Sequence, residues 1–320
     1  MTGEAVARLD RATDATGSLP FDGGVAARTD FVRRIGPRTF DFARQVAVMA
    51  IVNRTPDSFY DRGRTDSTAL AVEAGLRAIA EGADWVDVGG AKFAPGPPVP
   101  VDEEIARVVP VVEGLASAGA VISVDTFHGE VARAAIAAGA HVVNDTTGFS
   151  DPAMAGVVAE TGATVVVTHS LARPRTVYPR PHYDDVVAEV AAYLRERVAL
   201  AEGAGVASDR LVVDPGHDLN KNTRHSLELT RRLAEITSLG YPTLVALSNK
   251  DFIGESLGQR ERTKRVEGSL AAAVACIQRG ARIVRVHNVR ETVDAVRMVE
   301  AIEGWREPVF LEHNQGDVNP

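Results

Sequence analysis

Several polar side chains stand at the ends of short apolar runs, and their chemistry suits one common ligand. Asp125 follows VISV, Asn144 follows HVV, and Asp214 follows LVV. Two carboxylates and an amide form a wall of hydrogen-bond acceptors, which matches a flat heterocycle with several N–H donors along one edge. Each buried donor left unpaired costs about 1–3 kcal/mol, so such a wall discriminates between ligands. Lys250, beyond the run TLVAL, is placed to meet a ring carbonyl or nitrogen from the other side.

A second group of residues has the chemistry of an anion site. Arg285 and His287 lie two positions apart at the end of the run RIVRV, and alternate residues of a strand project to the same side. Asn53 ends the run VAVMAIV. Together with a helix N-terminus, these side chains can hold a phosphate or a metal-bound diphosphate.

Each of these residues also has a purely structural interpretation. Asp214 precedes Pro-Gly, so its carboxylate can serve a turn, and Asn144 precedes Asp-Thr-Thr, as a capping residue does. Arg285 can pair with a neighbouring carboxylate. Their joint placement at successive run ends favours a shared site over separate structural roles.

The apolar runs belong to an eightfold alternation of strand and helix patterns, which predicts an α/β fold, a (β/α)8 TIM barrel. The runs are rich in Val and Ile without polar alternation, as in parallel strands covered on both faces. Segments such as 129–140 and 186–205 have apolar residues at helical spacing and end at glycine. Because the strands of a barrel point the same way, the site is expected where they end.

The barrel is predicted to be a single domain over residues 35–305, after a loosely structured arm, 1–34, and before a tail, 306–320. The segment RTFDFARQ, before the first strand, is expected to form a hairpin on the barrel floor. Long loops follow the first two strands, at 53–68 and 89–104, and both are expected to act as lids.

The composition argues against several classes of protein. A net charge of -8 disfavours a nucleic-acid partner, although a local group of cations can still bind a small anion. No run is long enough to span a bilayer and the N-terminus lacks a signal pattern, so we expect no membrane partner and a cytoplasmic location. The single Cys276 cannot form an intrachain disulfide, which fits a reducing compartment.

Eight motifs follow one another in the order NRTPDSF, VDVGG, SVDTF, VNDTTG, VVDPG, LSNKDFIG, GSLAAAV and IVRVHNV. They resemble the strand-end motifs of dihydropteroate synthase, and the resemblance runs from about residue 36 to about residue 303. It implies a transferase of folate synthesis that joins 6-hydroxymethyl-dihydropterin diphosphate to 4-aminobenzoate and releases diphosphate. It also makes a homodimer the expected assembly.

The resemblance assigns roles to the residues at the run ends. The pterin would be bound by Asp125, Asn144, Asp214 and Lys250. The diphosphate and its Mg²⁺ would be held by Asn53, Arg285 and His287, with Asn53 as the residue toward the metal. Lys250, Arg285 and His287 would then be the catalytic residues. Catalysis would come mainly from stabilising the departing diphosphate and positioning the two substrates.

The sequence departs from the family pattern on the side of the second substrate. The usual Glu-Ser-Thr-Arg-Pro-Gly is replaced by residues 91–96, with Phe93 and Ala94 in place of Thr and Arg. The aromatic usual after Asp-Pro-Gly is replaced in the segment His217–Leu219. Asp251 adds a carboxylate beside Lys250, which disfavours a second substrate that is itself a carboxylate.

These departures favour a diverged paralogue that retains the pterin site and has weak or no condensing activity, so whether the chain is an active enzyme stays open. The alternative is an active dihydropteroate synthase in which Lys92, Arg54 or Arg64 restores the missing charge. A third hypothesis is a methyltransferase that uses methyltetrahydrofolate. The NRTPDSF loop and the Arg285-x-His287 pair disfavour it, because such proteins share the barrel and the pterin wall but lack both features.

Overall fold

A computed structural model describes residues 31–53, 68–178 and 180–314 of the chain. Its main sheet has eight parallel strands: β3 (Ala47–Asn53), β4 (Trp85–Gly89), β5 (Val121–Asp125), β6 (Val142–Asp145), β7 (Thr164–Thr168), β8 (Leu211–Asp214), β9 (Leu244–Val245) and β10 (Ile283–Val286). Neighbours follow the order β8-β7-β6-β5-β4-β3-β10-β9. A parallel bridge between Val213 and Thr243 joins the two ends of the sheet. The predicted (β/α)8 barrel is therefore confirmed.

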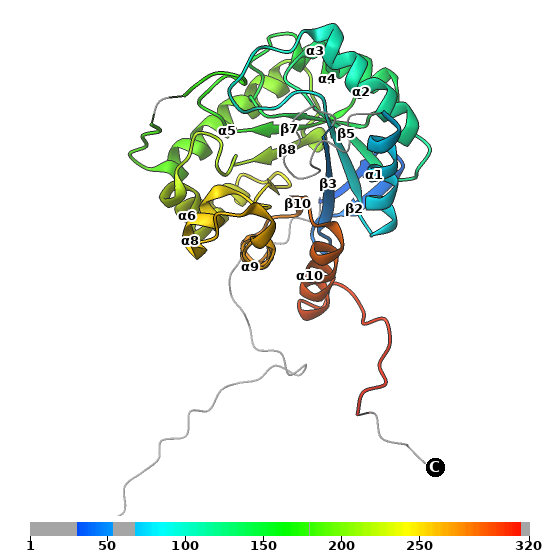
Figure 1. Cartoon of the computed structure of the whole chain (residues 1–320), viewed down its shortest axis with the longest axis vertical. Helices are drawn as coiled ribbons and strands as arrows, with labels where there is room; N and C mark the ends of the chain where they lie inside the picture. The colour runs from blue at the N-terminus through cyan, green and yellow to red at the C-terminus, as the bar shows by residue number, and fades with distance from the viewer. Residues whose placement is uncertain (1–30, 54–67, 179, 315–320) are drawn as a thin grey trace, which may run out of the picture.

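The helices lie around the strands (Figure 1). They are α1 (Thr68–Ala80), α2 (Val101–Leu115), α3 (Gly129–Ala137), α4 (Met154–Thr161), α5 (Val186–Gly203), α6 (Thr223–Arg231), α7 (Leu233–Thr237), α8 (Asp251–Leu257), α9 (Val266–Ile277) and α10 (Val289–Ile302), with the 3-10 turns η1 (Ser208–Arg210) and η2 (Arg262–Lys264). Among the described helices, none is both long and apolar enough to cross a membrane. Residues 54–67, most of the first predicted lid, lie outside the described residues.

A two-stranded hairpin closes the floor of the barrel, but only its second strand lies in the segment that the sequence predicts. Its strands are β1 (Val32–Ile35) and β2 (Arg38–Asp41), paired antiparallel. Phe40 is buried and stacks on Phe42 with ring centroids 5.4 Å apart, and its ring meets Trp85 edge-on at 5.9 Å. The predicted end of the N-terminal arm, at residue 34, therefore falls inside β1.

Alternate residues of each strand face different parts of the core. In β4, Trp85 packs with the residues inside the barrel, whereas Val86 and Val88 pack in the layer between strands and helices. Asp87 has the same phase as Trp85, so the strand geometry directs its carboxylate into the barrel. The Asp87 carboxylate is therefore buried inside the barrel.

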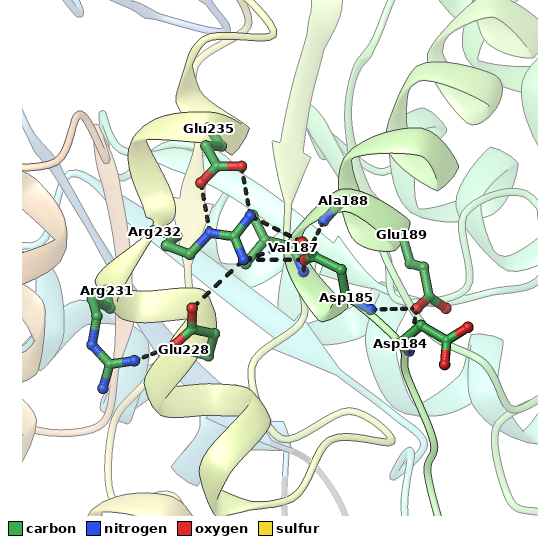
Figure 2. Close-up of polar contacts among 9 residues, drawn as sticks. All are labelled: Asp184, Asp185, Val187, Ala188, Glu189, Glu228, Arg231, Arg232 and Glu235. Carbon is green, nitrogen blue, oxygen red and sulfur yellow. Dashed lines mark hydrogen bonds and ion pairs between the residues drawn. The ribbon is translucent and has the colours of Figure 1, made fainter.

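An ion-pair network joins α5 to the α6–α7 segment (Figure 2). The Arg232 guanidinium lies 3.2 Å from the Asp185 carboxylate and 2.6 Å from that of Glu235. Asp185 also caps α5, because its side chain accepts from the N–H groups of Val187 and Ala188, both at 3.0 Å. These side chains are partly exposed, so the network mainly fixes the position of the α5 N-terminus. The β7–α5 loop is thereby anchored at its far end.

Candidate active site

Four neighbouring strands bring residues at or next to their ends to one level at the barrel mouth. In register, Asn53 of β3 pairs with Gly89 of β4, Gly89 with Asp125 of β5, and Asp125 with Asn144 of β6. A Cβ atom at Gly89 would lie 3.1 Å from Asn53 Oδ1 and 3.6 Å from Asp125 Cβ. The side chains of Asn53 and Asp125 therefore converge over Gly89, and the glycine leaves the space that they use.

Asp87 is the centre of the polar network in the mouth. It is fully buried, and its Oδ1 accepts a 2.6 Å hydrogen bond from Ser123 Oγ. Its Oδ2 accepts from Asn144 Nδ2 at 3.0 Å and from Arg285 Nε at 2.6 Å. Sequence analysis missed Asp87, although a charged residue inside the apolar run DWVDV is a signal that could have indicated it.

Arg285 bridges two carboxylates. Besides Asp87, it contacts Asp125, with Nη2 2.7 Å from Asp125 Oδ2. Burial alone would lower the pKa of Arg285, but Asp87 and Asp125 raise it, so the guanidinium stays charged. Burial raises the pKa of Asp125, and Arg285 opposes that shift. The structural interpretation of Arg285 as an ion-pair partner is thus correct, and the same pair also places its guanidinium at the mouth.

Asp214 and Lys250 lie on either side of the turn after β8. Asp214 is buried, and its Oδ1 accepts from Gly216 N at 2.7 Å, so it does serve the turn. Lys250 Nζ donates to the carbonyl of His217. Burial raises the pKa of Asp214 and lowers that of Lys250, and each charge opposes the shift of the other. Both side chains therefore bond to main-chain groups of this turn.

His287 lies at the end of β10, next to Ser248. The distance from its Nδ1 to Ser248 Oγ is 3.2 Å, and its backbone N–H donates to the same oxygen at 3.2 Å. Burial lowers the pKa of His287 to about 4, and the nearby Arg285 adds to the shift. At neutral pH His287 is therefore an uncharged hydrogen-bonding group beside the arginine.

A buried lysine, which sequence analysis also missed, bonds to the main chain of the turn after β8. Lys221 Nζ lies 2.8 Å from His169 Nδ1 and donates to the carbonyls of Gly216, at 2.9 Å, and Leu219, at 3.1 Å. Burial lowers the pKa of Lys221 to about 7. Its bonds to main-chain oxygens fix the backbone that carries Asp214.

The β4–α2 loop, predicted to be a lid, is held by one arginine of the β7–α5 loop. Arg175 Nη1 donates to the carbonyl of Ala94 at 2.8 Å, and its Nε donates to that of Pro97 at 3.0 Å. The main chains are also joined, because Arg175 N donates to Phe93 O at 3.0 Å and Gly96 N to Arg175 O at 3.2 Å. Ala94, which stands where the family pattern has Arg, thus lies in a loop that a different arginine organises.

The mouth combines the wall of acceptors with the cations Arg285 and Lys250, which bears on whether its side chains alone could hold a metal ion. Within the described residues, no group of three or more His, Cys, Asp or Glu side chains could hold a metal ion. Asn53 Oδ1 and the nearby Asp125 carboxylate are oxygen ligands of the kind that Mg²⁺ accepts when a substrate phosphate supplies the rest.

A (β/α)8 barrel whose mouth is lined in this way is typical of enzymes that bind a pterin, and the chain belongs to that family. The model of the pterin binding enzyme family matches residues 49–287.

Within the family, the chain is a dihydropteroate synthase-like protein. It is 50% identical over 272 residues to "Inactive dihydropteroate synthase 2" of Mycobacterium leprae, covering 82% of this chain and 92% of that one. It is 45% identical over 256 residues to the dihydropteroate synthase of Escherichia coli, covering 79% of this chain and 90% of that one. The solved structure of Xanthomonas albilineans dihydropteroate synthase with 4-aminobenzoic acid is similar, with a TM-score of 0.77, 44% identity and coverage of 83% and 96%.

Proposed function

We propose that this protein binds 6-hydroxymethyl-dihydropterin diphosphate and condenses it with 4-aminobenzoate weakly or not at all. The proposal rests on a contrast between the pterin residues and the loop that contains Ala94. The predicted pterin residues Asp125, Asn144 and Asp214 all lie at strand ends, and each is hydrogen-bonded. In contrast, Ala94 stands where the family pattern has a cationic Arg, and its carbonyl accepts from Arg175. The 50% identity to an M. leprae protein named as an inactive synthase agrees with this contrast.

The pterin half of the proposal rests on four side chains. Asp125, Asn144 and Asp214 supply acceptors at the ends of β5, β6 and β8, and Lys250 supplies a donor across the turn. Asp87, through Asn144 and Arg285, holds this wall in place. A fused heterocycle with N–H groups along one edge would donate to these side-chain oxygens, in addition to the protein donors that the two carboxylates already accept from.

The diphosphate half is assigned to Asn53, Arg285 and His287. Arg285 brings a permanent charge, and neutral His287 adds a hydrogen-bonding nitrogen. Asn53 would contribute one oxygen to Mg²⁺, with the diphosphate supplying others, and the ion would neutralise charge on the leaving group. Lys250, Arg285 and His287 are the residues to which any residual catalysis is assigned.

The alternative is an active dihydropteroate synthase, which the 45% identity to the E. coli synthase favours. It requires another cation to replace the missing arginine. Arg175 is poorly suited, because its guanidinium is bonded to the loop carbonyls of Ala94 and Pro97. Lys92 stays a candidate, and Arg54 and Arg64 lie outside the described residues.

We also propose a cytoplasmic homodimer. The dimer is supported by the family resemblance and by exposed apolar side chains of α10, since Met298 and Ile302 are 59% and 68% exposed. Met298 and Ile302 are four positions apart on one helix, so they share a face, and an exposed apolar face is a feature of interaction sites. Sedimentation of the full chain tests the assembly.

Complementation tests the proposed activity. We expect the full chain to fail to restore growth, without added folate end-products, in a cell that lacks its own synthase. The E. coli dihydropteroate synthase, expressed from the same vector, is the positive control. Growth supported by this chain would establish the active alternative.

A further inference from the structure

Asp218 occupies an unusual place beside Lys250. It lies in the β8–α6 loop, directly after His217, whose carbonyl accepts from Lys250 Nζ. Its φ of 62° is in the left-handed region, which costs most residues other than glycine roughly 1–2 kcal/mol. Asp218 is held there by Ser226, whose Oγ donates to Asp218 Oδ1 at 2.8 Å.

The other carboxylate oxygen reaches across to the N-terminus of α8. Asp218 Oδ2 accepts from the backbone N–H of Asp251 at 2.8 Å and from that of Phe252 at 3.3 Å. Asp218 therefore uses the donors that follow Lys250 in the chain. Its negative charge also attracts the Lys250 ammonium and opposes the lowering of the lysine pKa by burial.

The carboxylates around Lys250 are ordered from the inside of the barrel outwards. Asp214 is buried, Asp218 is partly buried, and the side chain of Asp251 is 65% exposed. Asp251 has its own partner, since its Oδ1 lies 2.8 Å from Arg265 Nη1. Of the three carboxylates, Asp218 and Asp251 are therefore the more accessible to an anion that comes from solvent.

We propose that Asp218 is a specificity-determining residue that excludes anionic second ligands from the Lys250 side of the mouth. The Asp218 carboxylate accepts the N–H groups of Asp251 and Phe252 and attracts the charge of Lys250. Its own negative charge repels an incoming carboxylate. The second ligand that this side of the site accepts is therefore neutral. This inference rests on the proposed function, because it concerns the ligand that would meet the bound pterin.

Two variants of Asp218 test the inference, and both new residues tolerate the positive φ at this position. Asp218→Asn removes the charge and keeps the shape, and Asp218→Gly removes the side chain in a conformation that glycine prefers. Asp209→Asn is the matched control, because exposed Asp209 lies in η1 before β8, at the opposite end of the strand. Thermal unfolding of each variant verifies that it is folded.

The measurement is isothermal titration of the full chain with 4-aminobenzoate and with its neutral analogue 4-aminobenzamide, in the absence and presence of pterin diphosphate. We expect the wild type to prefer the amide by about tenfold or more, and both Asp218 variants to reduce that preference by about tenfold. Asp209→Asn should keep the wild-type ratio within about twofold. New carboxylate binding in the Asp218 variants supports the inference even if the wild type binds neither probe.

The inference is overturned if neither Asp218 variant gains affinity for 4-aminobenzoate relative to the amide, or if the wild type prefers the carboxylate. Its failure can be distinguished from failure of the proposed function. A chain that shows the expected ratios but never binds pterin diphosphate refutes the proposed function alone. A chain that binds pterin diphosphate, while its Asp218 variants keep the wild-type ratio, refutes this inference alone.

Discussion

Arg285 and Asp87, which lie 198 positions apart in the chain, form a 2.6 Å ion pair at the centre of the barrel mouth. Asp87 also accepts from Ser123 and Asn144, so one buried carboxylate connects β4, β5, β6 and β10. The pair therefore links the acceptor wall to the cation that is assigned to the diphosphate.

Replacing Asp87 by alanine should remove this connection. Asp87→Ala leaves Arg285 with one carboxylate and leaves Ser123 and Asn144 without their buried acceptor. Breaking such a buried pair costs about 3–5 kcal/mol, which urea unfolding should detect. Asp294→Ala, on the exposed face of α10, is the control and should change stability by at most about 0.5 kcal/mol. Equal stability of the two variants would show that the pair is not a structural centre.

Sequence patterns located the strand-end residues because parallel strands share one direction. Asp125, Asn144 and Asp214 each follow an apolar run, so the barrel geometry brings them to one face without further information. Asp87 does not end a run, since it lies two residues before Gly89. Its role depends on an arginine that becomes its neighbour only when the barrel closes.

The contacts of Asp218 and Arg175 could not be predicted for a similar reason. Each residue joins its own loop to a segment distant in the chain: Asp218 reaches the first turn of α8, and Arg175 reaches the β4–α2 loop. The relative position of these segments is set by the packing of the barrel. Composition marks such loops as polar and glycine-rich, but it does not tell which carbonyl or N–H group a side chain will reach. The sequence therefore indicated Asp218 only as part of the segment His217–Leu219, in which the usual aromatic is replaced.

The stability of the protein should depend on pH through His287. Its folded pKa of about 4 lies below the ordinary value of 6.5, so the unfolded chain binds more protons between these values. Stability should therefore fall as the pH drops from about 6.5 toward 4, by at most about 3 kcal/mol from this group. In His287→Asn that contribution is absent, because asparagine does not titrate.

Urea unfolding of the wild type and His287→Asn, at pH values from about 4.5 to 8, measures this effect. The difference in free energy between the two should be constant above about pH 7.5 and should change in favour of the variant as the pH falls. The other buried histidines are shared by both proteins and cancel. A difference that stays constant over the whole range would contradict the assignment of a neutral, buried imidazole.

Gly216 should be indispensable to the turn that carries Asp214. Its φ is 68°, and a Cβ atom there would overlap the carbonyl oxygen of His169. Gly162 is a matched control, because its φ is 69° but a Cβ atom would meet nothing within 4 Å. Both alanine variants bear the backbone cost of about 1–2 kcal/mol, and only Gly216→Ala adds the clash.

Chemical denaturation should therefore place Gly216→Ala at least about 1 kcal/mol below Gly162→Ala in stability, since overpacking usually costs about 1–3 kcal/mol. The Gly216 variant should also bind a pterin more weakly. If the two variants were equally stable, the turn would have room that the structure does not provide.

Arg175 should keep the β4–α2 loop ordered. In Arg175→Ala, the carbonyls of Ala94 and Pro97 lose their donor, so the loop should open more often. Hydrogen exchange should then be about tenfold faster at the amide of Gly96, which donates to the main chain of residue 175. Arg173→Ala, an exposed neighbour, is the control and should leave the rate unchanged. Identical rates in both variants would mean that the guanidinium does not hold the loop.

Titration of the full chain with 6-hydroxymethyl-dihydropterin diphosphate and Mg²⁺ tests the central claim most directly. The wild type should bind the ligand saturably, and Asp214→Asn should bind it about tenfold or more weakly, because the amide keeps the bond to Gly216 N but replaces a carboxylate acceptor. No binding by the wild type, or equal binding by the two proteins, would contradict the claim that the barrel retains a pterin site.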